Sequence, residues 1–335
     1  MSRLTDVLDR YHRLGIAQQL DYEKLYRYSI ITHSTAIEGS TVTEVENQLL
    51  FDEGISANKP IAEQMMNLDL KKAYERGDQI AKSHQDWTLE VLCELSALVM
   101  KNTGSEYDTL VGSFSSAKGE LRLINVSAGR GGRSYLAWQK VPDRLQKFCT
   151  WLNESRNALN PTDVDRIYEL SFEAHYRLVT IHPWADGNGR MSRLLMNMVQ
   201  VEFGLVPSVV KKESRAAYIE SLAEARERED EAVFLNFMRE HHIQNIEEQI
   251  RDYIRSQDDT LNLENDPISD TLNLSEKERA VLSLILKDSG ITIAQMMEAS
   301  GCSRPTVIRT LRHLQERGLI RRVGAKKNGS WEIVT

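Results

Sequence analysis

The sequence lacks the features that mark membrane-bound, secreted and zinc-binding proteins. Its 335 residues include only three cysteines, and these are widely separated: Cys93, Cys149 and Cys302. An odd, scattered set indicates neither a disulfide framework nor a zinc site, so we expect reduced, structural thiols. No apolar run approaches the length that crosses a membrane, and residues 1–6 lack the apolar core of a signal peptide. We therefore expect a cytoplasmic protein without membrane partners.

The chain does have an ordinary globular composition, with an uneven distribution of charge. Hydrophobic residues make up 41% and charged residues 27%, and 335 residues are enough for two or three domains. The net charge of -7 argues against a protein that coats nucleic acid with its whole surface. Residues 275–335 nevertheless hold eleven Lys/Arg and six Asp/Glu, a net +5 that leaves -12 for the rest of the chain. The C-terminal segment is therefore predicted to be a separate domain.

Residues 181–193, with the sequence IHPWADGNGRMSR, combine the residue types of a phosphate site. Gly187 and Gly189 let the backbone approach an anion closely, because they lack a Cβ. Apolar residues then recur at helical spacing from Met191, which predicts a helix that begins at about Gly189 and points its free N–H groups at the glycine loop. Such a helix N-terminus binds anions. The alternative is a simple helix-to-helix connection.

Charged residues around this loop fit the same chemistry. Arg190, Arg193 and Asn197 lie at i, i+3 and i+7, which predicts a shared polar face opposite the apolar stripe. Asp186 can hold a magnesium ion between phosphate oxygens. His182 has a pKa suited to a general base, although a lone histidine is more often structural.

The segment from His182 to Arg193 resembles the signature of the Fic family, His-Pro-Phe-x-(Asp/Glu)-Gly-Asn-Gly-Arg-x-x-Arg, with Trp184 in place of Phe. We expect local packing to absorb the wider ring. The resemblance implies transfer of AMP from ATP to a protein hydroxyl, with His182 as base and Asp186 holding magnesium. It also implies that further residues contact the phosphates: Gly187, Asn188, Gly189, Arg190 and Arg193. Positioning and charge neutralisation dominate such transfers.

A second segment resembles the inhibitory motif of many Fic proteins, (Ser/Thr)-x-x-x-Glu-(Gly/Asn). Ser34, Glu38 and Gly39 match it. The resemblance implies that Glu38 pairs with Arg193 and obstructs placement of the γ-phosphate, which is physically sound because a carboxylate fits the same bidentate site. Glu38 can alternatively position a water that removes AMP from a modified protein. Without the resemblance, the motif reads as a helix end whose glutamate faces water.

Residues 119–138 are predicted to form a β-hairpin, with strands at 121–126 and 134–138 around a glycine-rich turn. The turn sequence Gly-Arg-Gly-Gly-Arg is a single short copy, so a solvated turn is favoured over an RNA-binding tract. Fic proteins have a flap here whose edge pairs with the target, which implies docking at Ser134, Tyr135 and Leu136. The chain departs from a typical flap, since Pro142 stands where a Pro-rich stretch is usual. Residues 103–118 are predicted to be loop.

Other parts of the first 257 residues are predicted to be helical, including residues 2–33, 211–225 and 229–255. Tyr218 matches a position where Fic proteins place a tyrosine near adenine, and it is equally consistent with a core residue. The predicted regions are an N-terminal helical region at 1–100 with its inhibitory helix at about 22–39, a Fic core at 101–257, an acidic linker at 258–272 and a further domain at 273–335.

The C-terminal domain resembles the winged-helix family, with three helices followed by strands at 319–323 and 331–334. Its basic and polar residues lie where DNA contacts are needed, on the third helix and in the wing: Arg304, Thr306, Arg309, Arg312, Lys326 and Lys327. Residues 301–327 carry eight basic residues and one acidic residue, which favours DNA binding over a protein-interaction or dimerisation role.

The sequence therefore predicts an all-α Fic core with a short β-hairpin flap, joined to a winged helix-turn-helix domain. The leading hypothesis is an autoinhibited protein adenylyltransferase that uses ATP and magnesium and modifies a Ser, Thr or Tyr hydroxyl of another protein or of itself. The rivals are a nucleotide-sensing, DNA-binding transcription regulator, a de-AMPylase and a transferase with another donor such as UTP, GTP or a phosphocholine carrier. An intact His182 favours the enzyme. Homodimerisation stays open.

Overall fold

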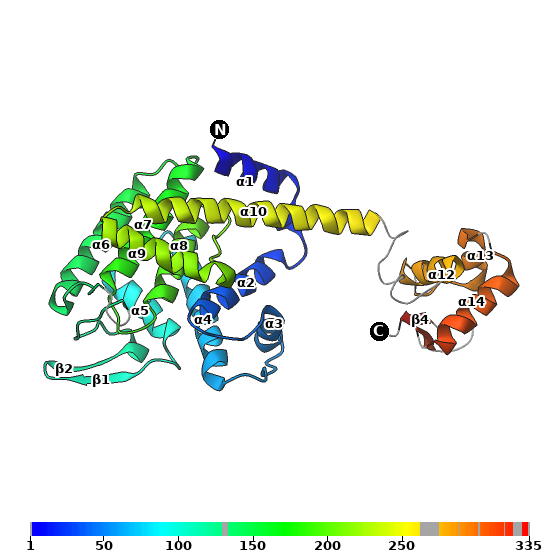
Figure 1. Cartoon of the computed structure of the whole chain (residues 1–335), viewed down its shortest axis with the longest axis horizontal. Coiled ribbons are helices and arrows are strands. Elements are labelled where there is room, and N and C mark those ends of the chain that lie inside the picture. Colours follow the sequence, from blue (N-terminus) through cyan, green and yellow to red (C-terminus); the bar gives the residue numbers. More distant parts are fainter. Residues whose placement is uncertain are drawn as a thin grey trace. The chain divides into compact units, whose positions relative to one another are not determined.

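The structure, a computed structural model, describes residues 2–128, 133–261, 275–287, 289–300, 302–317, 319–323 and 330–333. The chain divides into two compact units, Met1–Ile250 and Arg251–Thr335, and each is described by itself. Both are mostly helical and carry short antiparallel hairpins (Figure 1). The predicted fold class is confirmed. No helix within the described ranges is long and apolar enough to cross a membrane.

The first unit is built from helices, the last of which continues beyond it. Their bounds are α1 (Arg3–Arg13), α2 (Tyr22–Ile37), α3 (Glu44–Asp52), α4 (Ile61–Lys82), α5 (Leu89–Val99), α6 (Val141–Asn157), α7 (Val164–Ile181), α8 (Asn188–Glu202), α9 (Arg215–Arg228) and α10 (Ala232–Leu261). Short 3₁₀ turns are η1 (Ile16–Gln18), η2 (Ser116–Lys118), η3 (Trp138–Lys140) and η4 (Lys212–Ser214).

The single helix predicted over residues 2–33 is wrong. Gly15 and Asp21 adopt left-handed φ angles of 67° and 58°, and these two residues separate α1, η1 and α2. The helical pattern of the sequence continues across both points, but a left-handed residue ends a helix. The second helix then runs on to Ile37, so that Glu38 is its C-cap residue.

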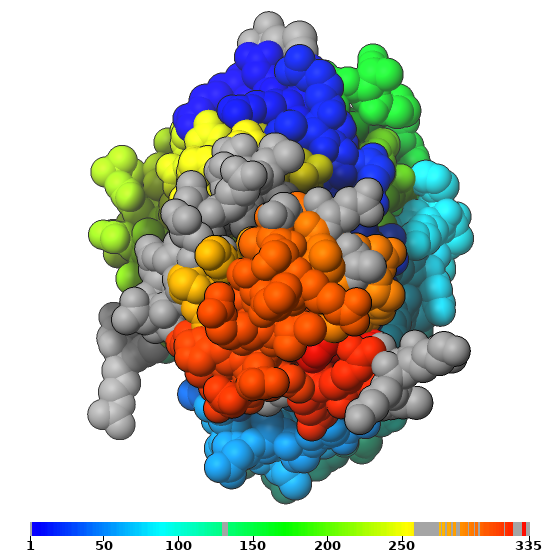
Figure 2. All heavy atoms as spheres, turned by 90° about the vertical axis from the view of Figure 1, so that its right-hand side faces the viewer, coloured from blue at the N-terminus to red at the C-terminus, as the bar shows by residue number. Residues whose placement is uncertain are grey.

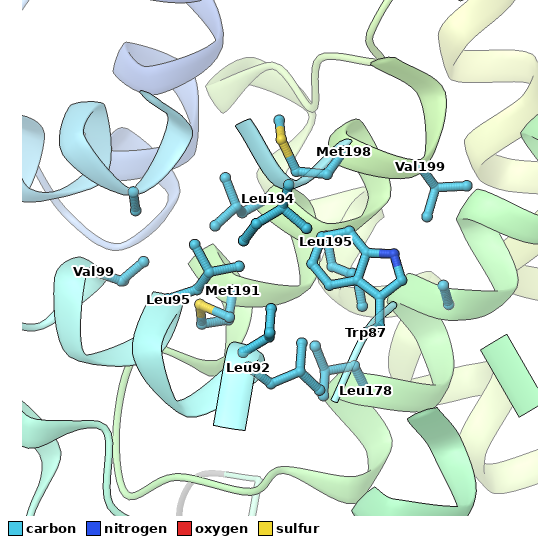
Figure 3. Packing of buried hydrophobic residues seen from close by; sticks show 14 of the residues in the cluster. Trp87, Leu92, Leu95, Val99, Leu178, Met191, Leu194, Leu195, Met198 and Val199 are labelled. Carbon is cyan, nitrogen blue, oxygen red and sulfur yellow. The ribbon is translucent and has the colours of Figure 1, made fainter. Parts of the chain in front are cut away.

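The core of the first unit surrounds α8, which packs among α4, α5 and α7 (Figure 3). Most side chains of α8 are buried on every face, including Arg190, Arg193 and Asn197. The residues of the predicted polar face are therefore buried as fully as those of the apolar stripe. Asn197 accepts a hydrogen bond from the Tyr74 hydroxyl (2.7 Å) and donates to the Ser208 carbonyl (2.8 Å), so its role is structural.

A regular hairpin lies where loop was predicted. Strands β1 (Glu106–Thr109) and β2 (Gly112–Ser115) pair antiparallel. Tyr107 stacks on Phe114 across the pair, with ring centroids 4.8 Å apart. The Thr109 hydroxyl donates to the Gly112 carbonyl (2.6 Å) and closes the turn. The abundant Gly, Ser and Thr residues of this segment masked the cross-strand aromatic pair, which stabilises short hairpins.

The two flap strands predicted at 121–126 and 134–138 are not present as strands. Among the described residues from 126 to 135, pairing consists of the bridge Ser127–Ser134 and two flanking backbone bonds, from Tyr135 to Val126 (2.9 Å) and from Ala128 to Arg133 (3.3 Å). Residues 121–126 form no strand, because the Ile124 and Leu136 carbonyls bond to the Arg122 side chain instead of to a partner strand.

The second unit contains α12 (Glu276–Lys287), α13 (Ile293–Ser300) and α14 (Arg304–Glu316), followed by β3 (Ile320–Val323) paired antiparallel with β4 (Ser330–Ile333). Val307, Leu311 and Leu314 of α14 pack in its core with Val281 and Met296. Helix α10 continues to Leu261, into the first residues of the predicted linker. The rest of that linker, and the wing residues Lys326 and Lys327, lie outside the described residues.

The three cysteines are unpaired, as predicted. Burial raises the pKa of the Cys93 thiol to about 11 and that of Cys149 to about 12. Both thiols are therefore protonated at neutral pH and poorly nucleophilic, which agrees with a structural role.

Candidate active site

The signature loop joins the C-terminus of α7 to the N-terminus of α8. His182 ends α7 in a left-handed conformation (φ 51°), and Gly187 precedes α8 with φ 80°. The Asn188 side chain closes the loop, since it accepts from the Trp184 N–H (3.1 Å) and donates to the Trp184 carbonyl (2.9 Å). A Cβ on Gly187 would lie 2.8 Å from the Met100 sulfur. The loop therefore leaves the N–H groups of the first turn of α8 available for an anion.

His182 is held as a neutral imidazole with one free nitrogen. Its Nδ1 lies 3.2 Å from the Val179 carbonyl, which can only accept, so Nδ1 carries the proton and Nε2 is the basic atom. The ring stacks on Tyr135, with centroids 3.8 Å apart. Burial, assisted by the positive charges of Arg122 and Arg226, lowers the pKa of His182 to about 4. The base form is therefore populated throughout the neutral range.

Arg190 and Arg193 point from α8 toward different partners. The Arg190 guanidinium is buried under the loop, 3.4 Å from the Val99 carbonyl and 3.8 Å from the Asp186 carboxylate. Its Nε is buried without a hydrogen-bond partner among the described residues. Arg193 instead faces α2.

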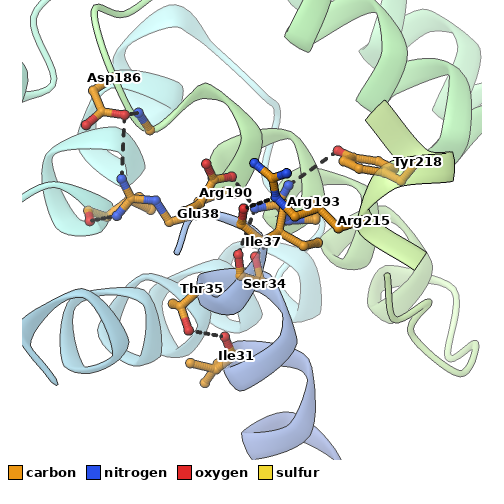
Figure 4. A network of polar contacts seen from close by, with 12 residues as sticks. Ile31, Ser34, Thr35, Ile37, Glu38, Asp186, Arg190, Arg193, Arg215 and Tyr218 are labelled. Carbon is orange, nitrogen blue, oxygen red and sulfur yellow. Dashed lines mark hydrogen bonds and ion pairs between the residues drawn. The ribbon is translucent and has the colours of Figure 1, made fainter. Parts of the chain in front are cut away.

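Arg193 is bound by both ends of the predicted inhibitory motif (Figure 4). It donates from Nε to the Ser34 hydroxyl (2.9 Å), and from Nη2 to the Ser34 carbonyl (2.9 Å) and the Glu38 carboxylate (2.6 Å). Gly39 follows with φ 105° and ends the α2 segment. A Cβ on Gly189 would lie 2.5 Å from Glu38 Oε1, so the close approach of Glu38 to the α8 N-terminus requires glycine there.

The two partners in this ion pair differ in exposure. The Arg193 side chain is 3% exposed, whereas that of Glu38 is 33% exposed. Burial acts to raise the pKa of Glu38, but the charge and hydrogen bond of Arg193 outweigh it and the pKa is lowered. Glu38 is therefore ionised at neutral pH and lies in contact with solvent, where a ligand can compete with it.

Tyr218 lies beneath Arg193 rather than in an open site. Its hydroxyl accepts from Arg193 Nη1 (3.3 Å) and is 2.8 Å from His175 Nε2. Burial keeps the pKa of Tyr218 raised and that of His175 well below its ordinary value, so the hydroxyl donates to a neutral imidazole. Tyr218 is fully buried among aromatic rings, including Phe234. The predicted contact with adenine stays a prediction.

Asp186 is the carboxylate available for a cation. Its side chain is 60% exposed, and one of its oxygens accepts from the Gly187 N–H (2.6 Å). The described residues contain no group of three His, Cys, Asp or Glu that could hold a metal alone. Magnesium needs only one or two carboxylates when substrate phosphates and waters supply its other ligands, so a single exposed aspartate beside a helix N-terminus fits it.

The flap residues lie beside the base. Tyr135 is sandwiched between His182 and Arg226, whose guanidinium carbon is 4.1 Å from the ring centroid. Arg226 also contacts the Arg133 and Ser134 carbonyls at 3.4 and 3.3 Å. A cavity of about 780 Å³ opens next to Ser134, Tyr135 and Leu136. These residues are therefore placed where a target segment and the base can meet, and their docking role stays a prediction.

Three residues of this site escaped the sequence analysis: Arg122, His175 and Arg226. Arg122 has the spacing of an ordinary strand residue, and His175 lies within the apolar stripe of α7. Their partners are carbonyls and side chains far away in the sequence, and a local pattern gives no signal for such contacts. Trp184 is fully buried as expected, and its indole N–H donates to the Gly119 carbonyl (3.0 Å).

Comparison with known proteins agrees with this geometry. Residues 86–200 match the Fic/DOC family. Protein adenylyltransferase fic-1 of Caenorhabditis elegans is 27% identical over 262 residues, which cover 77% of this chain and 48% of that protein. Protein adenylyltransferase Fic of Drosophila grimshawi is 30% identical over 226 residues, covering 66% and 42%. This chain thus contains a Fic domain at residues 86–200, and it spans less than half the length of these curated relatives.

A solved structure gives the same fold. The Fic-domain signaling protein of Bacteroides thetaiotaomicron superposes with a TM-score of 0.60 at 22% identity, covering 75% of this chain and 98% of that one.

The second unit has a family of its own. Residues 274–321 match the winged helix-turn-helix DNA-binding family. Arg304, Arg309 and Arg312 are exposed on α14, whose side chains Figure 2 shows in orange on the surface of this unit. Thr306 is partly buried, with its hydroxyl 2.9 Å from that of Ser303. The winged helix is therefore confirmed, and its DNA contacts stay a prediction.

Proposed function

We propose that the chain is an autoinhibited protein adenylyltransferase that transfers AMP from ATP to a Ser, Thr or Tyr hydroxyl of a protein target or of itself. The observation that carries this proposal is the pairing of Glu38 with Arg193 beside a base that is already neutral. The curated relatives are named protein adenylyltransferases, which supports the same reaction.

In the proposed reaction, the oxygen of the target hydroxyl attacks the α-phosphorus of ATP, and His182 Nε2 accepts the proton of that hydroxyl. A new oxygen–phosphorus bond forms, the bond between the α-phosphorus and the α,β-bridging oxygen breaks, and pyrophosphate leaves. The imidazolium then loses its proton to solvent. The N–H groups at the start of α8, with Gly187 and Gly189, accommodate the phosphates, while Arg190 and Arg193 neutralise their charge.

Magnesium fits this site at Asp186. When bound, the ion neutralises phosphate charge and stabilises the leaving pyrophosphate. The Asp186 carboxylate is fixed toward the phosphates by its bond from the Gly187 N–H (2.6 Å).

Autoinhibition follows from competition for one guanidinium. A carboxylate and a γ-phosphate oxygen are both anionic acceptors that suit the Arg193 fork, so both cannot occupy it. We infer that Glu38 forces the triphosphate into a position in which the α-phosphorus does not face the target hydroxyl. Release of Glu38 then permits transfer without any change at His182.

The proposal is tested by incorporation of labelled AMP from ATP with magnesium, into the purified protein and into a cell lysate. Three proteins are compared: wild type, Glu38→Gly, and Glu38→Gly with His182→Ala. We expect strong labelling with Glu38→Gly alone. The adenylyltransferase proposal fails if all three bind ATP and none incorporates label. Parallel reactions with UTP and GTP then test whether the enzyme uses another donor. Incubation with AMP-modified protein tests AMP removal, a reaction in which Glu38 positions a water.

A second candidate function is DNA binding by the second unit, which makes a nucleotide-sensing transcription regulator the main rival. The favouring observation is the set of exposed arginines on α14, the helix that enters the major groove in helix-turn-helix proteins. We expect the double variant Arg309→Ala and Arg312→Ala to bind DNA more weakly. The slope of the logarithm of its binding constant against the logarithm of salt concentration should fall by about two, because two fewer counterions are released. Arg228→Ala, at a 65% exposed arginine of α9, is the matched control. Equal loss in both proteins would argue against a specific α14 contact.

A further inference from the structure

The side chain of Arg122 joins three carbonyl groups that lie far apart in the chain. It is fully buried, and it donates from Nε to the His182 carbonyl (2.7 Å), from Nη1 to the Ile124 carbonyl (2.6 Å) and from Nη2 to the Leu136 carbonyl (2.5 Å). Ile124 and Leu136 belong to the two arms of the flap, before and after its turn. One side chain therefore links both flap arms to the residue that carries the base.

The backbone around Arg122 is bound to the same loop. Its N–H donates to the Pro183 carbonyl (3.1 Å), and Trp184 Nε1 donates to the Gly119 carbonyl (3.0 Å). The first three residues of the signature, 182–184, are thus each bonded to residues 119–122, which we call the support segment. Gly119 fixes this segment against α5, since a Cβ there would lie 2.0 Å from the Cys93 carbonyl.

Arg122 has no carboxylate partner among the described residues. Burial lowers the pKa of its guanidinium, and no ion pair offsets that effect. A buried cation held by neutral carbonyls costs folding free energy, and an apolar side chain of similar volume costs less. Stability alone therefore does not account for an arginine here. Its planar fork, with five donors, suits three carbonyls at fixed angles, which a lysine ammonium cannot match.

We propose that Arg122 is a positioning residue that fixes His182 and both arms of the flap in one frame. This inference rests on the proposed function. His182 is a non-glycine residue at φ 51°, a conformation that persists only when its surroundings impose it, and its carbonyl is the group that Arg122 binds. The flap presents the target hydroxyl, and His182 Nε2 accepts its proton. Arg122 sets the distance between the two, and its charge adds to the burial that lowers the pKa of the imidazole.

The test uses the full chain carrying Glu38→Gly, with Arg122→Met and Arg122→Lys. The matched controls are Arg156→Met and Arg156→Lys, because Arg156 is equally buried but pairs with Glu202 and Asp86 away from the signature loop. We expect Arg122→Met to lower kcat for AMP transfer about 100-fold, the size of effect that misplacement of a reacting group produces, and to leave the ATP dissociation constant within about twofold. Arg122→Lys retains the charge and recovers part of the rate.

A readout independent of turnover is the NMR titration of His182. The pKa of His182 rises in Arg122→Met, because a nearby positive charge is lost, and stays near its original value in Arg122→Lys and in both Arg156 variants. The proposal is overturned if folded Arg122→Met retains kcat within about threefold, or if Arg156→Met loses as much. If Arg122→Met does not fold, full kcat in Arg122→Lys overturns it. Should the parent incorporate no AMP, the proposed function fails, and the titration still tests whether the Arg122 side chain acts on His182.

Discussion

The two halves of the active site are in opposite states. The half that carries His182 is complete. Arg122 donates to the His182 backbone carbonyl, and the Val179 carbonyl accepts from Nδ1. Tyr135 covers one ring face, and Nε2 is unprotonated. The half that is to hold the triphosphate is already occupied by the chain itself, since Ser34 and Glu38 bind Arg193. Readiness for proton transfer and readiness for phosphate binding are therefore set by separate residues.

For the proposed autoinhibition, the difference means that Glu38 can block Arg193 while the base stays in place. Glu38 imitates the charge and geometry of a phosphate oxygen, so it occupies Arg193 without distorting the base. The Glu38 side chain is one-third exposed, so water and solutes reach it. In the proposed function, a ligand that displaces Glu38 from Arg193 releases the inhibition.

The largest expected effect separates the two halves by removing the base. In the Glu38→Gly background, His182→Ala should lower the rate of AMP incorporation about 10²- to 10⁴-fold, the usual contribution of a general base. ATP affinity should stay unchanged, because His182 belongs to the half that does not hold the triphosphate. Initial rates and equilibrium ATP binding check the two statements. A parallel loss of ATP binding would mean that the halves are not separate.

A smaller effect is expected from partial release of the phosphate half. Glu38→Gln keeps the size of the side chain but removes its charge, and it should raise AMP incorporation about 5- to 150-fold, the range of typical coupling free energies. Ser34→Ala should raise it less, because the Ser34 carbonyl still accepts from Arg193. Labelling rates at saturating ATP rank the three proteins. A larger gain from Ser34→Ala would show that the serine hydroxyl dominates the inhibition.

The pH dependence of AMP transfer should be set by the titration of His182. His182 acts as base when neutral, and its pKa is lowered to about 4, so the rate of Glu38→Gly should be level across neutral pH and fall only as pH approaches 4. The free energy of unfolding should depend on the same group. Because folding lowers the pKa of His182, its contribution to the free energy of unfolding is complete above the unfolded-state pKa near 6.5, and it is lost as the pH falls toward 4. A rate profile with its midpoint near 6.5 would contradict the burial of His182.

The smallest effect concerns the residue that departs from the family signature. Trp184→Phe removes the donor to the Gly119 carbonyl and keeps an aromatic ring, so it should cost about 1 kcal/mol of unfolding free energy, the net value of one hydrogen bond. Denaturant titration measures this. Transfer activity in the Glu38→Gly background should change little, since Arg122 still holds the loop. A large loss of activity would assign the positioning role to Trp184 instead.

Much of this site was predictable because its residues are neighbours in the sequence. Residues 182–193 lie within one turn and one helix start, and glycine spacing with helical periodicity identifies both. The pairing of Glu38 with Arg193 spans 155 positions and was predicted only through the family resemblance. The same holds for the winged helix, whose order of helices and strands was correct.

The errors have physical causes. Alternating apolar residues at 121–126 predicted a strand, but the Arg122 guanidinium takes the carbonyls that a strand would use. At 106–115 the small residues predicted loop, and the Tyr107–Phe114 stack stabilises a hairpin. Helical spacing predicted one shared polar face for Arg190, Arg193 and Asn197, whereas nearly all of α8 is buried and each of these side chains has partners of its own. In each case a contact or a backbone conformation that the residue pattern does not show decides the local structure.

The central claim is that Glu38 blocks the phosphate half while the base half stays ready. NMR titration of His182 in wild type and in Glu38→Gly, combined with AMP incorporation by the same samples, tests it directly. Burial and the charges of Arg122 and Arg226 lower the pKa of His182, and Glu38→Gly changes none of them. We therefore predict the same pKa, near 4, in both proteins and much faster incorporation by Glu38→Gly. A His182 pKa that changes on release of Glu38 would show that inhibition acts through the base and would contradict the account.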